Sequence, residues 1–232
     1  MQSARPNIVY IHSHDTGRYI QPYGHAIATP NLQRLAEEGV LFRQAFCAAP
    51  TCSPSRAALL TGQAAHSSGM LGLAHRGFSL NDYRQHIVHS LHSAGYFSAL
   101  AGVQHVAREA TQIGYDAVLG RTAAEELAVS WLEDKPAQPF FLDVGFFETH
   151  RYPAAGGAHN PEGWQGDSRY CVPPPPLPDT QETRQDMADF KVAAARLDTK
   201  IGRILEALEQ NGLADNTLVI YTTDHGIALP YM

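Results

Sequence analysis

The feature of this sequence that most constrains its fold is a set of four short, mostly apolar segments separated by segments with helical periodicity. The apolar segments span residues 6–13, 96–102, 139–147 and 216–222. Short apolar runs of this kind are typical of strands that are buried on both faces of a parallel sheet. Alternation of such strands with helices predicts an α/β fold, in which a mostly parallel β-sheet carries helices on both faces.

Four helices are predicted from capping residues and terminating glycines and from apolar side chains at helical spacing. They are expected to run from Thr29 to Gly39, from Asn81 to Ala94, over residues 122–134, and from Asp186 or Asp189 to about Asn211. Residues 40–45 are expected to be extended. Residues 61–78 and 151–185 are rich in glycine, proline or polar side chains and are expected to be loops.

Histidine and aspartate residues follow the four predicted strands. They are His14 and Asp15, His105, His150, and Asp224 and His225. In open α/β sheets the ligand site lies beyond the carboxyl ends of the strands, so these side chains are expected to converge on one site. Carboxylates and imidazoles bind metals, and imidazole exchanges protons near neutral pH. The pattern therefore predicts a site for metal-assisted, acid–base chemistry.

A cysteine motif lies between the first two predicted strands. Cys52 stands two residues before Pro54 and four before Arg56, and Gly62 ends the helix-forming run that follows. Cys52 is therefore expected at a helix N-terminus, where backbone N–H groups and the helix dipole favour negative charge. Arg56 falls on the same helical face. This arrangement suits attack by a nucleophile on a sulfate or phosphate group.

The run from Cys52 to Gly62, Cys-Ser-Pro-Ser-Arg-Ala-Ala-Leu-Leu-Thr-Gly, resembles the signature of type I sulfatases, which belong to the alkaline phosphatase superfamily. Residues 149–151, Thr-His-Arg, are similar to an element of heparan N-sulfatase-like members. The resemblance implies that a formylglycine-generating enzyme oxidises Cys52 to formylglycine. It also implies hydrolysis of a sulfate ester or sulfamate carried by a sulfated small molecule or glycan.

The same resemblance implies one divalent metal ion, calcium in the family, held by Asp15, Asp224 and the modified Cys52. This sequence departs from the family pattern at two places, with His14 in place of an aspartate and His225 where asparagine is common. With both histidines included, the candidate ligands are His14, Asp15, Cys52, Asp224 and His225. Oxygen ligands suit calcium, whereas imidazoles shift the preference toward zinc, manganese or iron.

The resemblance further implies catalytic roles outside the metal site. Arg56 would help to deprotonate the nucleophile made from Cys52, His105 would act on that nucleophile, and His150 would protonate the leaving group. The segment around His105 resembles the family's Lys-x-His element but lacks its lysine, which removes one sulfate-binding cation. The other histidines considered are interpreted as strand, loop or helix-surface residues; they are His12, His66, His75, His86, His89 and His92.

Charge and hydropathy argue against two kinds of partner. The chain has 17 basic and 23 acidic residues, a net charge of −6 and no basic run, so no nucleic acid is expected. No apolar stretch approaches the roughly 18 residues of a membrane span. Three cysteines do not make a disulfide framework, and no secretory signal is recognisable. The chain as written is expected to be cytoplasmic, or periplasmic or secreted if a leader was removed.

At 232 residues the chain is shorter than sulfatases, and its sequence stops soon after His225. Residues 1–232 are therefore expected to form a partial, N-terminal sulfatase catalytic domain that includes the loop 151–185. Alone it is expected to turn over weakly or not at all. Two alternatives stay open. One is a phosphonate or phosphate monoester hydrolase of the same superfamily, which His225 favours; the other is a non-catalytic remnant that binds sulfated glycans.

Overall fold

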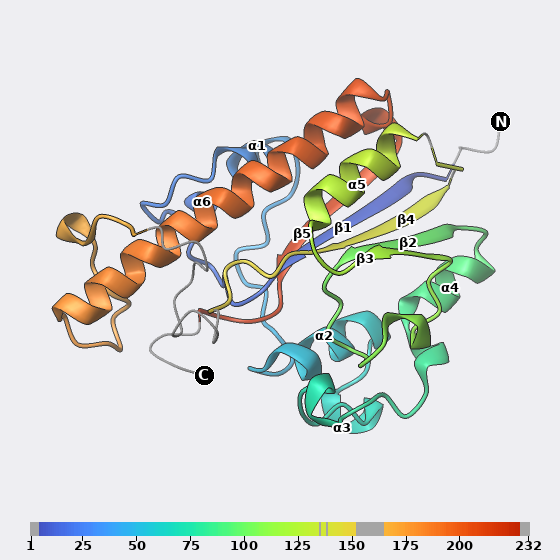
Figure 1. The fold of residues 1–232 in the computed structure, drawn as a ribbon, viewed down its shortest axis with the longest axis horizontal. Helices are drawn as coiled ribbons and strands as arrows, with labels where there is room; N and C mark the ends of the chain where they lie inside the picture. The colour runs from blue at the N-terminus through green and yellow to red at the C-terminus, as the bar shows by residue number, and fades with distance from the viewer. Residues whose placement is uncertain (1–4, 135, 138, 152–164, 228–232) are drawn as a thin grey trace.

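The computed structural model describes residues 5–134, 136–137, 139–151 and 165–227 (Figure 1). The strands are β1 (Asn7–Ser13), β2 (Phe97–Gly102), β3 (Ala117–Gly120), β4 (Phe140–Gly145) and β5 (Thr217–Thr223). The α-helices are α1 (Pro30–Glu38), α2 (Cys52–Thr61), α3 (Ala65–Ser68), α4 (Ile87–Ser93), α5 (Ala124–Glu133) and α6 (Gln181–Gln210).

The five strands form one sheet in the order β3-β2-β4-β1-β5, and all of its strand pairs are parallel. Four strands coincide with the apolar segments of the sequence, so the predicted parallel sheet is confirmed. The sequence does not predict β3, a strand of four residues at one edge of the sheet. Four residues are too few to show a hydrophobic period.

Helices cover both faces of this sheet, as predicted (Figure 1). On one face Val9 and Ile11 of β1 pack in a buried cluster with side chains of α1, α5 and α6. On the other face Tyr10 belongs to a second cluster, which includes Leu60 of α2 and Val88 of α4. Successive side chains of a strand point to opposite faces, so β1 contributes to both clusters.

The predicted start of the longest helix is wrong. α6 begins at Gln181 rather than at Asp186 or Asp189. Thr180 and Thr183 form a capping box, in which Thr180 Oγ1 accepts a hydrogen bond from Thr183 N at 3.3 Å. This reciprocal cap satisfies backbone donors in the first turn and allows the helix to begin early.

The predicted start of α4 is also wrong. The helix begins at Ile87, where the side chain of His86 serves as the N-cap. A separate 3-10 turn, Tyr83–Gln85, precedes it. Asn81 instead donates a hydrogen bond to Ser67 O at 3.2 Å. N-cap positions prefer Ser, Thr, Asp and Asn, so the sequence did not indicate that a histidine caps this helix.

The start of α1 is as predicted, but its cap comes from another helix. The side chain of Thr29 makes no capping hydrogen bond. Asp198 of α6 does so instead, because its carboxylate accepts hydrogen bonds from Asn31 N at 3.1 Å and Leu32 N at 2.8 Å. This buried carboxylate joins the two helices and satisfies donors that would otherwise be orphaned.

The predicted loops are only partly irregular. Residues 40–45, predicted to be extended, form no strand and contain a turn at residues 43–44. The predicted loop 61–78 contains α3 and a 3-10 turn, Ala74–Arg76. Of the predicted loop 151–185, residues 152–164 lie outside the described residues. Residues 181–185 belong to α6, so the predicted loop ends too late. Residues 165–180 include a 3-10 turn, Ser168–Tyr170, and Gly166 N donates a hydrogen bond to Asp189 Oδ1 of α6 at 2.8 Å.

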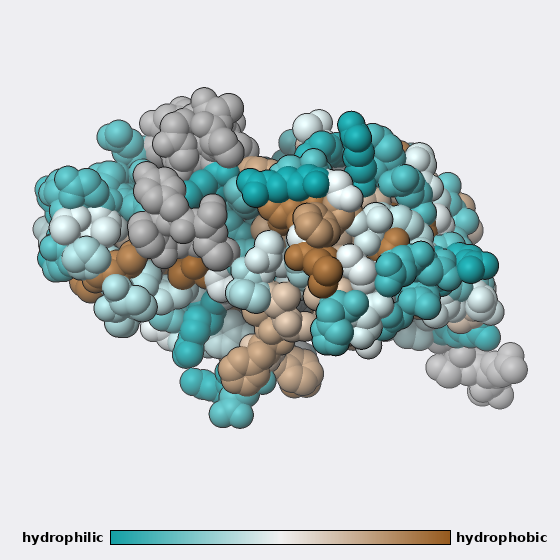
Figure 2. Space-filling model, turned by 90° about the horizontal axis from the view of Figure 1, so that it is seen from below, coloured by the Kyte–Doolittle hydropathy of each residue, from teal (hydrophilic) through white to brown (hydrophobic). Residues whose placement is uncertain are grey.

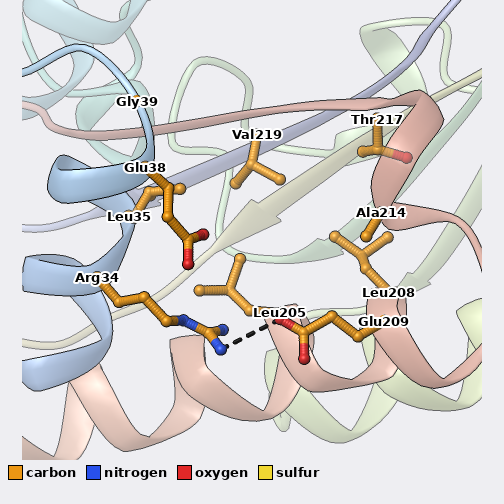
Figure 3. Close-up of a pocket in the computed structure, with 10 residues that line it drawn as sticks. All are labelled: Arg34, Leu35, Glu38, Gly39, Leu205, Leu208, Glu209, Ala214, Thr217 and Val219. Carbon is orange, nitrogen blue, oxygen red and sulfur yellow. Dashed lines mark ion pairs between the residues drawn. The ribbon is translucent and has the colours of Figure 1, made fainter.

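A cavity of ≈ 290 Å³ lies between α1, the C-terminal part of α6 and the start of β5 (Figure 3). Leu205 and Val219 line it, and an ion pair between Arg34 and Glu209, 3.1 Å long, crosses it. Thr217, another lining residue, is the first residue of β5. The cavity therefore lies at the amino end of that strand, away from the predicted site.

The surface is mixed in polarity. Figure 2 shows apolar patches among hydrophilic side chains on the face viewed from below Figure 1. The segment between α1 and α2 exposes the apolar side chains of Val40, Phe42 and Phe46. Among the described helices, none combines the length and the apolar character that crossing a bilayer requires.

Candidate active site

The predicted site residues converge at the carboxyl ends of the strands. His14 and Asp15 follow β1, His105 follows β2, and Asp224 follows β5. Ring centroids of His14 and His105 lie 5.6 Å apart. The backbone of Asp15 donates to Asp224 Oδ1 at 2.9 Å. Segments that are more than 200 residues apart in sequence thus meet at one rim of the sheet, as expected for an α/β fold.

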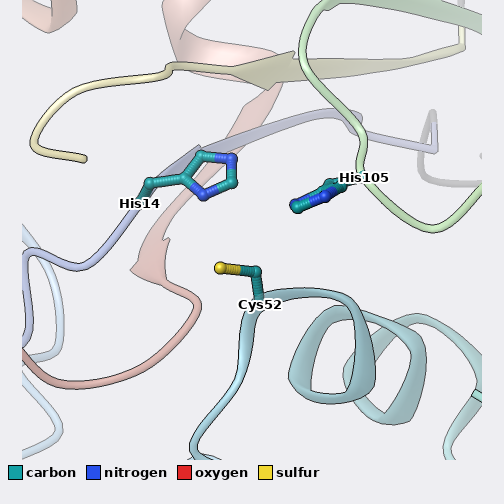
Figure 4. A group of neighbouring side chains, drawn as sticks. All are labelled: His14, Cys52 and His105. Atoms are coloured by element: carbon teal, nitrogen blue, oxygen red, sulfur yellow. The ribbon is translucent and has the colours of Figure 1, made fainter. Parts of the chain in front are cut away.

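Cys52 is the first residue of α2 and is 8% exposed. Its Sγ lies 3.4 Å from His225 Nε2 and 3.9 Å from Asp15 Oδ1. Figure 4 shows the thiol, the ring of His14 and the ring of His105 around a shared space. The helix N-terminus predicted from the sequence therefore directs Cys52 at the strand ends.

The surroundings of Cys52 disfavour its ionisation to a thiolate, whereas its position at a helix N-terminus predicts the opposite. Burial raises the pKa of the Cys52 thiol, and the charges of Asp224 and Asp15 raise it further, against the smaller effect of Arg56. The thiolate is the nucleophilic form of cysteine, so the unmodified side chain is a poor nucleophile here. Burial is the main cause of this raised pKa and the two carboxylates add to it, and the local sequence around the motif reveals neither.

Arg56 directs its guanidinium at Asp224. Its Nε and Nη2 each lie 3.1 Å from Asp224 Oδ2. Nη2 also donates to Ser13 O at 3.1 Å, and Nη1 contacts His12 Nδ1. The side chain is 2% exposed, so its charge acts with little solvent screening. Arg56 is thus a fixed cation behind the candidate metal ligands.

The two aspartates have opposite electrostatic surroundings. Burial disfavours ionisation of Asp224, but Arg56 and His14, whose Nδ1 lies 3.2 Å from Asp224 Oδ2, outweigh it and hold the pKa of Asp224 well below its usual range. Burial raises the pKa of Asp15, and the charge of Asp224 raises it further. His225 Nε2 lies 3.1 Å from Asp15 Oδ1. The pair therefore concentrates negative charge that a cation would offset.

The donor atoms fit a divalent cation. Ligand atoms of His14, Asp15, Cys52 and Asp224 all lie within 4.8 Å of one another, and so do those of His14, Cys52 and His105. His14 Nε2 is buried and has no hydrogen-bond partner within the described ranges. Burial and the charge of Arg56 keep the pKa of His14 well below its ordinary value, so its ring is neutral, as a metal ligand requires.

His225 was predicted as a ligand but belongs to neither group of potential ligands in the described part of the chain. It contacts both Cys52 and Asp15, at 3.4 Å and 3.1 Å from its Nε2. Its Nδ1 lies 3.0 Å from Gly226 O, which positions the ring. His225 is therefore next to the donor set, and its role as a ligand stays a prediction.

The two predicted acid–base histidines flank His14. His150 Nε2 lies 3.8 Å from Asp15 Oδ2, and its ring centroid lies 5.6 Å from that of His14. His105 Nε2 lies 3.0 Å from His75 Nδ1, with the two rings stacked. Burial, Arg56 and His75 lower the pKa of His105 to about 4, so this ring is neutral.

Sequence reasoning missed several partners of the site. His75 was interpreted as a loop residue, yet it contacts His105. His12, interpreted from the sequence as a structural residue, is buried in β1, but the sequence did not predict that its ring lies between Arg56 and Asp143, which Tyr115 also contacts. A histidine and an aspartate inside two apolar strand segments were the available signal, because buried polar groups need partners.

The three histidines near α4 lie outside the site, as predicted, but the interpretation of His86 as a helix-surface residue is wrong, because it is fully buried at the N-cap. His86 caps the helix, and burial lowers its pKa to about 4. His89 Nε2 lies 2.9 Å from Ile113 O, and His92 Nε2 lies 2.8 Å from Asp116 Oδ2. Each ring has its own local partner, so these residues do not form a shared ligand set.

Comparisons with known proteins agree with this geometry. The sequence model of the Sulfatase family matches residues 6–131 and 123–231. Human N-sulphoglucosamine sulphohydrolase is 32% identical over 98% of this chain and 52% of its own length. The ulvan-active sulfatase of Formosa agariphila is 26% identical over 97% of this chain and 44% of its own length. The chain spans about half the length of these curated relatives.

Solved structures share the fold. One, described as a complex with its substrate D-glucosamine-2-N,6-O-disulfate, has a TM-score of 0.73 at 20% identity over 96% of this chain and 66% of that chain. The phosphonate monoester hydrolase of Agrobacterium radiobacter has a TM-score of 0.66 at 21% identity over 96% of this chain and 63% of that chain. Because the family match extends over nearly the whole sequence, this chain belongs to the sulfatase family.

Proposed function

We propose that this chain carries the reaction centre of a hydrolase of sulfate esters or sulfamates, with a nucleophile made from Cys52. The observation that carries the proposal is the position of Cys52 Sγ at the start of α2, 3.9 Å from Asp15 Oδ1 and among the potential metal ligands. The raised pKa of the thiol argues that the cysteine needs modification before it can act. Oxidation to formylglycine by a generating enzyme would supply that change.

His14, Asp15 and Asp224 would hold the divalent cation, with the side chain at position 52 beside it. The bound cation would polarise the sulfate oxygens and offset the charge of the two carboxylates. Arg56 keeps Asp224 ionised and oriented, because both of its contacting nitrogens lie 3.1 Å from Asp224 Oδ2. Asp224 is thus prepared as a ligand before any cation arrives.

His105 and His150 suit opposite proton-transfer roles. His105 has a lowered pKa of about 4, so near neutral pH it is the free base and can accept a proton from the nucleophile. The side chain of His150 is 30% exposed and lies 3.8 Å from Asp15, at the open side of the site. That position suits donation of a proton to the departing alcohol or amine, which must leave toward solvent.

The substrate proposed is a sulfated sugar or glycan, since relatives include N-sulphoglucosamine sulphohydrolase and N-acetylgalactosamine-6-sulfatase. The cation proposed is calcium or a first-row transition ion such as manganese, because the donor set mixes carboxylates with the imidazole of His14. Calorimetric titration of the two ions into metal-free protein separates these cases. The His14→Asp variant should shift the preference toward calcium.

A phosphonate or phosphate monoester hydrolase is the second candidate. It is favoured by His225, whose Nε2 lies 3.1 Å from Asp15 Oδ1, and by the likeness in fold to a phosphonate monoester hydrolase. Matched nitrophenyl sulfate, nitrophenyl phosphate and phenylphosphonate esters, assayed with one enzyme preparation, rank the three activities. Binding of a sulfated sugar without hydrolysis of any ester would instead favour the non-catalytic alternative.

The decisive experiment combines maturation and turnover. The protein is produced with and without a formylglycine-generating enzyme, and the peptide that contains Cys52 is analysed by mass spectrometry. We expect an aldehyde at this position only in the matured protein, together with a sulfatase activity that is weak because the chain spans about half the length of its curated relatives. Cys52→Ala should abolish the activity, while Cys171→Ala, the matched change at a buried cysteine that contacts Asp167 O, should retain it. Equal activity in matured and unmatured protein refutes the proposed nucleophile.

A further inference from the structure

A chain of three buried side chains holds Arg56 on the side opposite Asp224. Arg56 Nη1 contacts His12 Nδ1, His12 Nε2 lies 2.8 Å from Asp143 Oδ1, and Tyr115 Oη lies 2.5 Å from Asp143 Oδ2. His12 is 2% exposed, Asp143 0% and Tyr115 9%. None of the three takes part in the chemistry proposed above, and burying such polar groups costs free energy unless they are paired.

The register of the sheet leaves space for these three side chains. His12 on β1 is paired in register with Gly145 on β4. A Cβ at Gly145 would lie 2.6 Å from His12 Cε1, so a side chain there would displace the imidazole ring. Asp143 lies two residues earlier on β4 and faces the same side of the sheet. The strand register therefore places an imidazole and a carboxylate in line behind the guanidinium.

Hydrogen-bond polarity determines the state of His12. Arginine has five N–H donors and no acceptor, so His12 Nδ1 must accept from Arg56. The proton of a neutral ring is then on Nε2, which donates to Asp143 Oδ1. Tyr115 donates its hydroxyl proton to the other carboxylate oxygen. A protonated His12 would direct an N–H at the guanidinium, so one tautomer of the neutral ring satisfies every contact.

Ser13 O also accepts from Arg56, but the bond to His12 matters because the proposed function uses Asp224 in two ways. Its Oδ2 accepts from Arg56, and the same carboxylate is a candidate metal ligand. A bound cation would compete with Arg56 for the electron pairs of Asp224 and would weaken its hold on the guanidinium. The bond to His12, backed by the negative charge of Asp143, keeps Arg56 in place when that happens.

We propose that His12, Asp143 and Tyr115 are positioning residues that orient the Arg56 guanidinium at the reaction centre. The proposal deepens the proposed function and rests on it for its consequence in turnover. The orientation of Arg56 itself does not depend on which ester the enzyme hydrolyses. The two parts can therefore be tested separately.

The test uses four variants of the protein. His12→Leu removes the acceptor, and His12→Gln restores an acceptor for Arg56 and a donor for Asp143. Tyr115→Phe removes only a hydroxyl and preserves the ring, so it remains informative if His12→Leu folds poorly. His89→Leu is the matched control, because His89 is a half-buried histidine whose Nε2 lies 2.9 Å from the backbone oxygen of Ile113.

The first readout is nitrogen-detected NMR of the histidine and arginine side chains. We expect His12 to carry its proton on Nε2, and Arg56 to show separate, slowly exchanging Nη–H signals. Those Arg56 signals should average in His12→Leu and persist in His12→Gln and His89→Leu; Tyr115→Phe should broaden them. A proton on His12 Nδ1, or Arg56 signals that are unchanged in both His12→Leu and Tyr115→Phe, overturns the proposal.

The second readout is kcat/KM for nitrophenyl sulfate with matured protein. Removing a group that orients a site residue typically costs roughly 10–100-fold, so we expect a loss of that size for His12→Leu, carried mainly by kcat. His12→Gln should recover most of it. Full activity in His12→Leu overturns the positioning role. Suppose that the matured wild-type protein hydrolyses no ester but the Arg56 signals differ among the variants as expected. In that case the proposed function fails, and the orientation of Arg56 by His12 stands.

Discussion

The Asp198→Asn substitution should destabilise the protein by removing the cap that α6 provides for α1. The Asp198 carboxylate is 1% exposed. Its Oδ1 accepts from Leu32 N at 2.8 Å, and its Oδ2 accepts from Asn31 N at 3.1 Å and from Asn31 Nδ2 at 2.9 Å. Asparagine keeps an oxygen in place of one carboxylate oxygen, but it places an NH₂ group where the other oxygen accepts, so an NH₂ donor then faces N–H donors of Asn31 or Leu32.

The size of the destabilisation by Asp198→Asn follows from these contacts. At least one buried N–H loses its acceptor, which costs about 1–3 kcal/mol. Loss of the negative charge at a helix N-terminus adds about 0.5–1 kcal/mol. We therefore expect the free energy of unfolding to fall by about 1.5–4 kcal/mol. Because the site residues lie on strand ends and α2, their local geometry should change little.

Urea titration followed by far-UV circular dichroism measures this change, with the midpoint lowered and the slope unchanged. Asp215→Asn, at an exposed position after α6, is the control and should stay within about 0.5 kcal/mol of the parent. A loss below about 1 kcal/mol in Asp198→Asn would show that water or a local rearrangement replaces the carboxylate, which refutes the capping argument.

Three further predictions concern pH, packing and metal. His86→Met should remove part of the acid sensitivity of the fold: burial lowers the pKa of His86 from 6.5 to about 4. The neutral His86 ring therefore makes its full contribution to the free energy of unfolding above pH 6.5, and this contribution falls by about 3 kcal/mol as the pH drops to 4. Urea titrations above pH 6.5 and at pH 4 would measure the loss. An equal loss in parent and variant would contradict the prediction. Gly145→Ala should destabilise by about 3 kcal/mol in thermal unfolding, because its Cβ would lie 1.9 Å from Val103 O; an unchanged midpoint would refute the close approach. A divalent cation at about 100 times its Kd should stabilise the protein by about 3 kcal/mol, reversibly with chelator, and Asp15→Asn should lose most of this gain. No stabilisation by calcium, manganese or zinc would rule out the cation site.

The sequence by itself determined the parallel sheet and the positions of four of its strands. It also identified the strand ends where His14, Asp15 and Asp224 lie, and the start of α2 at Cys52. These features depend on local information, namely runs of apolar residues, terminating glycines and a motif whose residues all lie within one helix. General rules of α/β topology then brought the strand ends together without any knowledge of contacts.

Tertiary structure alone decided the partners and charges within the site. Arg56 contacts His12, 44 positions away, and Asp224, 168 positions away, and His12 contacts Asp143, 131 positions away. The raised pKa of Cys52 depends first on its burial and then on carboxylates from two strand ends, although its helix position predicts the opposite. Burial and distance between remote segments set these interactions, and no periodicity within a single segment encodes them.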